Sequence, residues 1–260
     1  MTIEGGQNLN FAIPSNYLKA LLTQSNPVKP FSQGQQSISA ETYFKLGNMR
    51  YGLGQYEIAI ADYDKAIRLN PYYAGGYHNR GNAKFNLSQY AAAIADYDTA
   101  IRLNLDYAAG YVNRGNAKDE LGEYFAAIAD YNVAVRLNPD YADAYYGRGN
   151  AKHNLSQYSA ALADYNAAIR LNPDYAEAYV NRGIAKRNLS QYSAALADYN
   201  AAIRFKPDFA VAYYNRGWAK AQLGRTRGAK QDLRTALRLA KLAGSEDLKT
   251  RIEKTLKLVE

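Results

Sequence analysis

Asparagine recurs at two positions three residues apart, and both positions return with a period of 34 residues. The first holds Asn79, Asn113, Asn181 and Asn215, and the second holds Asn48, Asn82, Asn116 and Asn150. Residues three apart share one face of a helix, and an asparagine amide both donates and accepts hydrogen bonds. This asparagine ladder can therefore pair with the N–H and C=O groups of an extended peptide. The alternative is a polar face that was copied by duplication and contacts only solvent.

Other reactive side chains are scarce in this sequence. There is no cysteine, and the two histidines, His78 and His153, occupy different repeat positions. Disulfides, thiol nucleophiles and thiolate metal sites are excluded, and two separated histidines do not supply the ligands of a metal site. Both histidines are expected to be solvated or to face a partner. No plausible His, Asp and Ser set is present, so the sequence predicts a non-catalytic protein without metal or cofactor.

The asparagines belong to a unit that the chain repeats six times without insertion. The units are residues 40–73, 74–107, 108–141, 142–175, 176–209 and 210–243. Most carry tyrosine at positions 4, 17 and 24, glycine at position 8, and alanine at positions 20 and 27. This pattern resembles the tetratricopeptide repeat (TPR), a pair of antiparallel helices that stacks into a solenoid. The resemblance implies an all-α, right-handed superhelical solenoid.

Within each unit we expect helix A over about positions 1–14 and helix B over about positions 18–31. Glycine at position 8 lies inside helix A, where it costs about 1 kcal/mol relative to alanine. A steric cause is therefore expected, and in the TPR family helix B packs closely on helix A there. The tyrosines are expected to fill the space between helices and between units.

The sixth unit departs from the pattern. Thr226 and Leu233 replace tyrosines, and Lys241 stands where proline would end helix B. Helix B can therefore continue to Ala243, with Gly244 as its C-terminal cap. Residues 244–260 are predicted to form a capping helix that turns apolar residues inward and charged residues outward.

By resemblance, positions 2, 5, 6, 9, 12 and 13 of helix A face the inner groove of the solenoid. The ladder falls on positions 6 and 9, and Phe44, His78, Tyr146, Tyr214 and Trp218 also fall on groove positions. Aromatic residues in a groove are typical anchors for partner peptides, although packing against the adjacent unit explains each one equally well. Trp218 is the preferred anchor. The resemblance implies a scaffold that binds a peptide or helix of a partner protein in the concave groove.

One known TPR ligand is disfavoured. TPR domains that hold the acidic tails of chaperones use a carboxylate clamp of lysine, arginine and asparagine. The corresponding residues here are Phe44, Asn48, Asn79, Ala109 and Asn113. The asparagines match but every cation is missing, and neutral amides do not replace charge-assisted pairs.

Two sets of basic residues need separate interpretations. Arginine at position 7 and lysine at position 11 recur together with aspartate at position 23, which predicts ion pairs between helices. The net charge of +8 is concentrated elsewhere: residues 40–209 sum to zero, whereas residues 210–260 carry 12 Lys or Arg against 5 Asp or Glu. A nucleic-acid groove would run along the solenoid, so none is expected. An acidic partner or nucleic acid bound at the basic C-terminal face remains an alternative function.

Residues 1–39 do not carry the repeat and form an N-terminal extension. The segment from Gly5 to Pro14, with the helix expected after it to Leu22, resembles the C-terminal end of a bacterial trypsin-like serine protease domain. Two interpretations of the extension stay open: an ordinary capping helix on a flexible linker, or a protease remnant, which would make the chain the interaction module of a protease–TPR fusion. No catalytic residue of that family is present. Without a long apolar run or a signal sequence, a cytoplasmic location without membrane insertion is expected, or a periplasmic one if the chain belongs to an exported fusion.

Overall fold

A computed structural model describes residues 39–104 and 106–259 of the chain. Within these residues the secondary structure is entirely helical, which confirms the predicted all-α class. The helices are α2 (Ala40–Gly52), α3 (Tyr56–Leu69), α4 (Ala74–Asn86), α5 (Tyr90–Leu103), α6 (Ala108–Glu120), α7 (Tyr124–Leu137), α8 (Ala142–Asn154), α9 (Tyr158–Leu171), α10 (Ala176–Asn188), α11 (Tyr192–Phe205), α12 (Ala210–Gln222), α13 (Thr226–Leu242) and α14 (Glu246–Val259). The protease-like segment at residues 5–22 lies outside the described residues.

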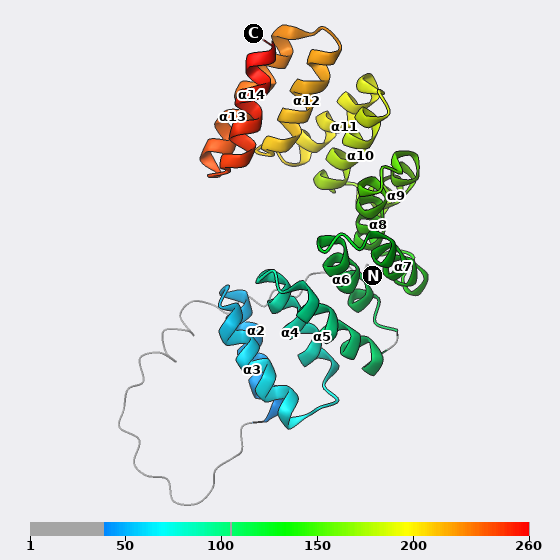
Figure 1. The fold of residues 1–260 in the computed structure, drawn as a ribbon, viewed down its shortest axis with the longest axis vertical. Helices are drawn as coiled ribbons and strands as arrows, with labels where there is room; N and C mark the ends of the chain where they lie inside the picture. The colour runs from blue at the N-terminus through cyan, green and yellow to red at the C-terminus, as the bar shows by residue number, and fades with distance from the viewer. Residues whose placement is uncertain (1–38, 105, 260) are drawn as a thin grey trace, which may run out of the picture.

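The helices form one curved row of antiparallel pairs. Each helix packs against the next one in sequence, from α2 and α3 to α13 and α14. The even-numbered A helices of successive units also touch, for example α6 and α8, whereas no such contact joins the B helices within the described ranges. The row therefore curves toward the A helices, and its two ends open to the same side (Figure 1). The A helices line the concave face.

The turn between helix A and helix B requires a left-handed residue at position 15. Gly54, Gly122 and Gly224 have φ angles of 73°, 76° and 70° there. Serine takes the same place in the other units, and Ser88, Ser156 and Ser190 all have φ of 58°. This conformation is unfavourable for a residue with a Cβ atom, so the serines are held in place by the helices that they join.

The tyrosine at position 24 is the centre of each unit's core. Tyr63, Tyr97, Tyr131, Tyr165 and Tyr199 are all at most 1% exposed. A Cβ atom built on the position-8 glycine would lie 2.5 to 2.8 Å from the ring Cε1 of that tyrosine in units one to five. The predicted steric cause of the glycine is confirmed, and the contact that enforces it is the tyrosine ring.

The recurring charged residues form ion pairs on the side of helix A that faces helix B. In the fifth unit, Arg182 Nη2 lies 2.6 Å from Asp198 Oδ1, and Lys186 Nζ lies 2.8 Å from Asp198 Oδ2. Arg182 Nη1 also donates to Asn166 Oδ1 of the preceding unit at 2.7 Å. Asp198 is only 3% exposed. The same pairing recurs in the neighbouring units, so this charged stripe is structural, as predicted.

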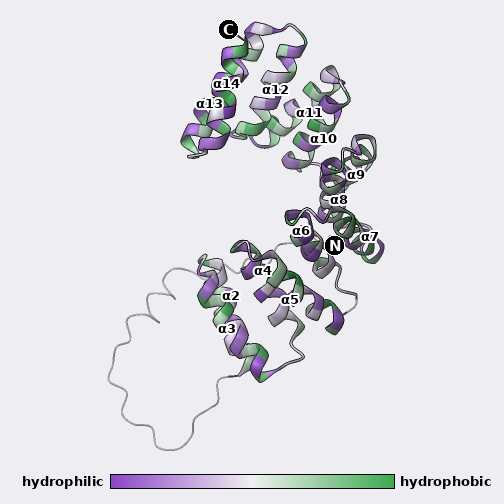
Figure 2. Cartoon of the chain, in the orientation of Figure 1, coloured by the Kyte–Doolittle hydropathy of each residue, from purple (hydrophilic) through white to green (hydrophobic). Residues whose placement is uncertain are grey.

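The C-terminal end of the row is closed by α14. Ile252 is completely buried and packs against Leu233, Ala236 and Ala240 of α13. Gly244, with φ of 66°, lies in the turn between the two helices. Figure 2 shows hydrophilic and hydrophobic residues interspersed along the helices. No helix in the described ranges combines the length and the apolar composition needed to cross a membrane.

Candidate binding groove

The asparagine ladder is a hydrogen-bond network within the protein. At position 9, the Oδ1 atoms of Asn48, Asn82, Asn116 and Asn150 accept from the hydroxyl of the position-24 tyrosine of the same unit, at 2.7 to 2.9 Å. At position 6, Asn79, Asn113 and Asn181 donate from Nδ2 to the position-9 Oδ1 of the preceding unit, at 2.7 to 2.9 Å. The ladder therefore satisfies the buried tyrosine hydroxyls and joins one unit to the next.

Part of each amide remains available on the concave face. The network uses the Oδ1 atoms of position 9 and the Nδ2 atoms of position 6. Within the described residues, no other side chain engages the Nδ2 atoms of Asn48, Asn82 and Asn116 or the Oδ1 atoms of Asn79, Asn113 and Asn181. Asn150 also interacts with the Tyr146 hydroxyl. Asn48 is exposed and the other six are half-buried. Both donors and acceptors are thus present in fixed orientations.

The ladder is interrupted at two places. Gly147 takes position 6 of the fourth unit, so Asn116 Oδ1 accepts only from Tyr131. Ile184 takes position 9 of the fifth unit, and the buried hydroxyl of Tyr199 consequently has no hydrogen-bond partner in the described part of the chain. These two substitutions leave a vacant acceptor at one place and an unsatisfied hydroxyl at the other.

A different cluster follows the second interruption. Asn215 is 4% exposed, accepts from Arg187 Nη1 at 2.9 Å and donates to the Val211 carbonyl oxygen at 2.8 Å. The Arg187 guanidinium lies over the ring of Trp218, 5.0 Å from the ring centroid. Trp218 also packs against Tyr192, with ring centroids 5.9 Å apart. The preferred anchor is therefore half-buried in contacts within the protein.

The other aromatic candidates also have partners within the chain. The rings of Phe44, His78 and Tyr146 each lie 4.8 Å, centroid to centroid, from the last tyrosine of their own unit. Tyr214 contacts α14, where its hydroxyl lies 3.4 Å from Thr255 Oγ1. Except for His78, these residues are half-buried.

The expectation that both histidines are solvated or face a partner is wrong for His78. Its side chain is 7% exposed, and its Nδ1 atom has no hydrogen-bond partner among the described residues. Burial lowers the pKa of His78 to about 4. The imidazole is therefore neutral at physiological pH and packs as an aromatic ring. His153 is half-buried. Its pKa is lowered mainly by burial and, to a smaller extent, by the positive charge of Arg187.

Three adjoining pockets run along the concave face. The first, of about 280 Å³, is lined by Tyr51, Asn82, Phe85, Asn86, Tyr97, Asn113 and Asn116. The second, of about 300 Å³, is lined by Phe85, Asn116, Asp119, Glu120, Tyr131, Asp143, Tyr146, Gly147, Asn150 and Tyr175. The third, of about 260 Å³, is lined by Asp119, Asn150, His153, Asn154, Tyr165, Asn181 and Ile184. Because neighbouring pockets share lining residues, they form one groove from α2 to α10.

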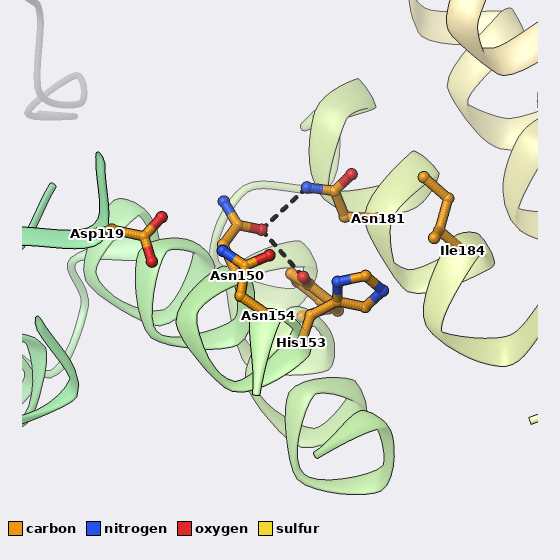
Figure 3. Close-up of a pocket in the computed structure, with 7 residues that line it drawn as sticks. Asp119, Asn150, His153, Asn154, Asn181 and Ile184 are labelled. Carbon is orange, nitrogen blue, oxygen red and sulfur yellow. Dashed lines mark hydrogen bonds between the residues drawn. The ribbon is translucent and has the colours of Figure 1, made fainter. Parts of the chain in front are cut away.

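Six of the predicted site residues line this groove: Asn82, Asn113, Asn116, Asn150, Asn181 and Tyr146. The other seven do not line its pockets: Asn48, Asn79, Asn215, Phe44, His78, Tyr214 and Trp218. Figure 3 shows the third pocket, with Asp119 of α6 on one side, Asn150, His153 and Asn154 of α8 in the middle, and Asn181 and Ile184 of α10 beyond.

The acidic residues of the groove were not among the predicted site residues. Asp119 and Glu120 occupy positions 12 and 13 of the third unit, and Asp143 occupies position 2 of the fourth. The pKa of Asp119 is raised, mainly by burial. A hydrogen bond from the Asn154 side chain lowers this pKa, and the negative charge of Glu120 raises it further. All three positions face the groove by family resemblance, so reading these positions unit by unit could have found them.

Comparison with protein families gives a consistent match along the chain. A family model described as a TPR repeat matches residues 47–88, 120–156, 149–189 and 185–224. A second model, described as a tetratricopeptide repeat, matches residues 74–107 and 210–241. A comparison with curated proteins found no match.

Several solved structures are similar to this one. YrrB, described as a TPR protein with an unusual peptide-binding site, is 26% identical with a TM-score of 0.56, over 74% of this chain and 97% of YrrB. A tetratricopeptide repeat protein from Parabacteroides merdae is 20% identical, with a TM-score of 0.67 over 86% of both chains. The APC/C hetero-tetramer Cut9–Hcn1 is 18% identical with a TM-score of 0.75, over 86% of this chain and 43% of the matched one. The last two similarities concern the fold alone.

Proposed function

The chain belongs to the tetratricopeptide repeat family, and on that premise we propose that it is a non-catalytic interaction scaffold that holds an extended segment of a partner protein in its concave groove. The observation that carries this proposal is the continuous groove from α2 to α10, whose floor presents unengaged amide donors and acceptors. An extended peptide has unpaired N–H and C=O groups that need such partners. The description of YrrB as a peptide-binding TPR protein supports the same use of the fold.

The ladder is suited to recognising a peptide backbone because it is rigid before the ligand arrives. Each position-9 asparagine is fixed through Oδ1 by a buried tyrosine hydroxyl, as in the pair of Asn150 and Tyr165 at 2.9 Å. Groups that are already oriented lose little rotamer entropy on binding. The aromatic rings at the first pocket, Tyr51 and Phe85, add apolar surface at the same end of the groove.

The test uses short unstructured peptides selected from a random library against the intact chain. Asn154 is exposed and lines the third pocket, so Asn154→Arg places a long side chain in the groove. Ser159→Arg, on the exposed face of α9 and outside the pockets, is the matched control. Affinities are measured by fluorescence anisotropy with synthetic copies of the selected peptides.

We expect Asn154→Arg to weaken binding by at least about tenfold, or about 1.4 kcal/mol, whereas Ser159→Arg binds like the unmodified chain. If both variants weakened peptide binding equally, or if neither variant weakened it, the peptides would bind outside the groove. A library that yields no binding peptide at all would also count against the proposed function.

A further inference from the structure

The second pocket lies where the ladder is interrupted at Gly147. Where position 9 of one unit and position 6 of the next unit are both asparagine, the Oδ1 atom at position 9 receives two hydrogen bonds. Asn150, for example, receives them from Tyr165 and Asn181. Asn116 receives only the one from Tyr131, at 2.7 Å, because Gly147 has no side chain to donate the second. A Cβ atom at residue 147 would lie 2.6 Å from the Tyr131 ring. The tyrosine ring therefore occupies the place that a side chain at residue 147 would take, and a pocket of about 300 Å³ lies beside it.

Three of the ten residues that line this pocket carry carboxylates. Its lining includes the carboxylates of Asp119, Glu120 and Asp143 together with the side chain of Asn116. The Asp119 Oδ1 atom is buried and has no hydrogen-bond partner in the described part of the chain. Asp143 is held in place by the Tyr175 hydroxyl, which donates to its Oδ1 atom at 2.9 Å. A buried acceptor without a donor is unfavourable, so the pocket favours a group that donates a hydrogen bond or carries a positive charge.

The cations of the adjacent helix do not supply that charge. Arg148 and Lys152 on α8 both pair with Asp164, on the side facing α9. The carboxylates also do not converge as metal ligands: the described residues contain no group of three His, Asp or Glu side chains that could hold a metal ion. A ligand held in the groove can supply a donor and a positive charge at this pocket.

We propose that the pocket beside Gly147 receives a lysine or arginine side chain of the bound partner segment, with Asp119 and Asn116 as acceptors at its floor and Glu120 and Asp143 at its sides. This proposal rests on the proposed function, because it specifies a side chain of the segment that the groove holds. The opposite specificity, for an acidic segment, would place like charges together in a partly desolvated site. Charge-assisted hydrogen bonds to carboxylates are among the strongest available to a peptide side chain.

The first experiment probes the pocket without any peptide. Nα-acetyl-arginine amide and Nα-acetyl-lysine amide are titrated into the isotope-labelled chain, and the backbone amide of Gly147 and the side-chain amide of Asn116 are followed by NMR. Nα-acetyl-norleucine amide, with a similar carbon chain and no charge, is the control probe. We expect both cationic probes, and not norleucine amide, to shift these two signals. Equal shifts with norleucine amide, or none with either cation, would overturn the proposal.

The matched variants are Asp119→Asn and Asp140→Asn. Asp119→Asn keeps the shape of the side chain and removes its charge, and the fold is not at risk because this carboxylate has an unsatisfied buried oxygen. Asp140 is exposed in the turn before α8 and lies outside the pockets. We expect Asp119→Asn to weaken the binding of a cationic probe by about tenfold or more, and Asp140→Asn to leave it unchanged. Equal binding to both variants would contradict the assignment of Asp119.

The peptides selected for the proposed function provide a second and separate readout. The inference is supported if the selected peptides are enriched in lysine or arginine at one position. This enrichment should be lost when the same library is selected against the Asp119→Asn variant. Peptides that bind in the groove without any basic residue would overturn the inference and leave the proposed function standing. A cation-binding pocket in a chain that selects no peptide would overturn the proposed function instead.

Discussion

The ladder can be tested by removing the same hydroxyl group from two equivalent tyrosines. Tyr165 and Tyr199 occupy the same repeat position, are 1% and 0% exposed, and lie against Gly149 and Gly183 in the same way. Their hydroxyl groups differ: the Tyr165 hydroxyl donates to Asn150 Oδ1 at 2.9 Å, whereas the Tyr199 hydroxyl has no partner among the described residues. Replacement of each tyrosine by phenylalanine removes only that hydroxyl.

The expected effects have opposite signs. Tyr165→Phe removes a hydrogen bond whose net contribution is about 1 kcal/mol, while Asn150 keeps its bond from Asn181. Tyr199→Phe removes a buried hydroxyl whose unsatisfied state costs about 1–3 kcal/mol, so the variant should be more stable by about 1 kcal/mol. The free energies of unfolding of the two variants should therefore differ by about 2 kcal/mol.

The assay is urea unfolding followed by far-UV circular dichroism. Because repeat arrays can depart from two-state unfolding, the comparison is made between midpoints of transitions that keep the same slope. The variant Ile184→Asn is the control: it should supply the missing acceptor, after which Tyr199→Phe becomes destabilising. Equal destabilisation by Tyr165→Phe and Tyr199→Phe would refute the interpretation of the ladder as a network that satisfies the tyrosines.

Three further changes test other parts of the structure. The pKa of His78 is about 4 in the folded chain, against an ordinary value of 6.5. As the pH falls from 6.5 to 4, the unfolded chain takes up a proton that the folded chain does not, so the free energy of unfolding should fall by about 3 kcal/mol. His78→Phe should remove this fall from the pH dependence of thermal melting. Ser190→Gly should stabilise the chain by up to about 1 kcal/mol in urea unfolding, because φ of 58° is unfavourable for serine; a lower midpoint would contradict this. Arg182→Met should destabilise by about 3 kcal/mol because it leaves the buried Asp198 with less compensating charge, whereas Arg170→Met, at an exposed site, should change the midpoint little.

The packing of the repeat was predictable because its causes recur with it. Tyrosine at position 24 and glycine at position 8 contact each other in five units, and Arg182 and Asp198 represent an ion pair that returns in the same way. A contact made within every unit leaves the same residue types at the same spacing. Periodicity therefore identified the helices, the core and the charged stripe without any information on their distances.

The role of the ladder could not be deduced in this way. An asparagine such as Asn82 is placed by Tyr97 of its own unit and by Asn113 of the next, and both contacts depend on how the helices stack. His78 is buried against Tyr107, whose ring meets the imidazole edge to face with centroids 4.8 Å apart. Single-copy features such as Asp119 and Gly147 were missed because a search for recurring residues passes over what occurs once.

The position of a bound peptide tests the groove most directly. A peptide selected against the chain is added to the isotope-labelled protein, and the side-chain amide signals of asparagine are followed by NMR. Asn116 and Asn150 line the groove, whereas Asn166 and Asn200 accept hydrogen bonds from Arg182 and Arg216 on the other side of the A helices. We predict that the side-chain amide signals of Asn116 and Asn150 shift and that those of Asn166 and Asn200 stay unchanged. Shifts confined to the second pair would contradict the assignment of the concave groove as the binding site.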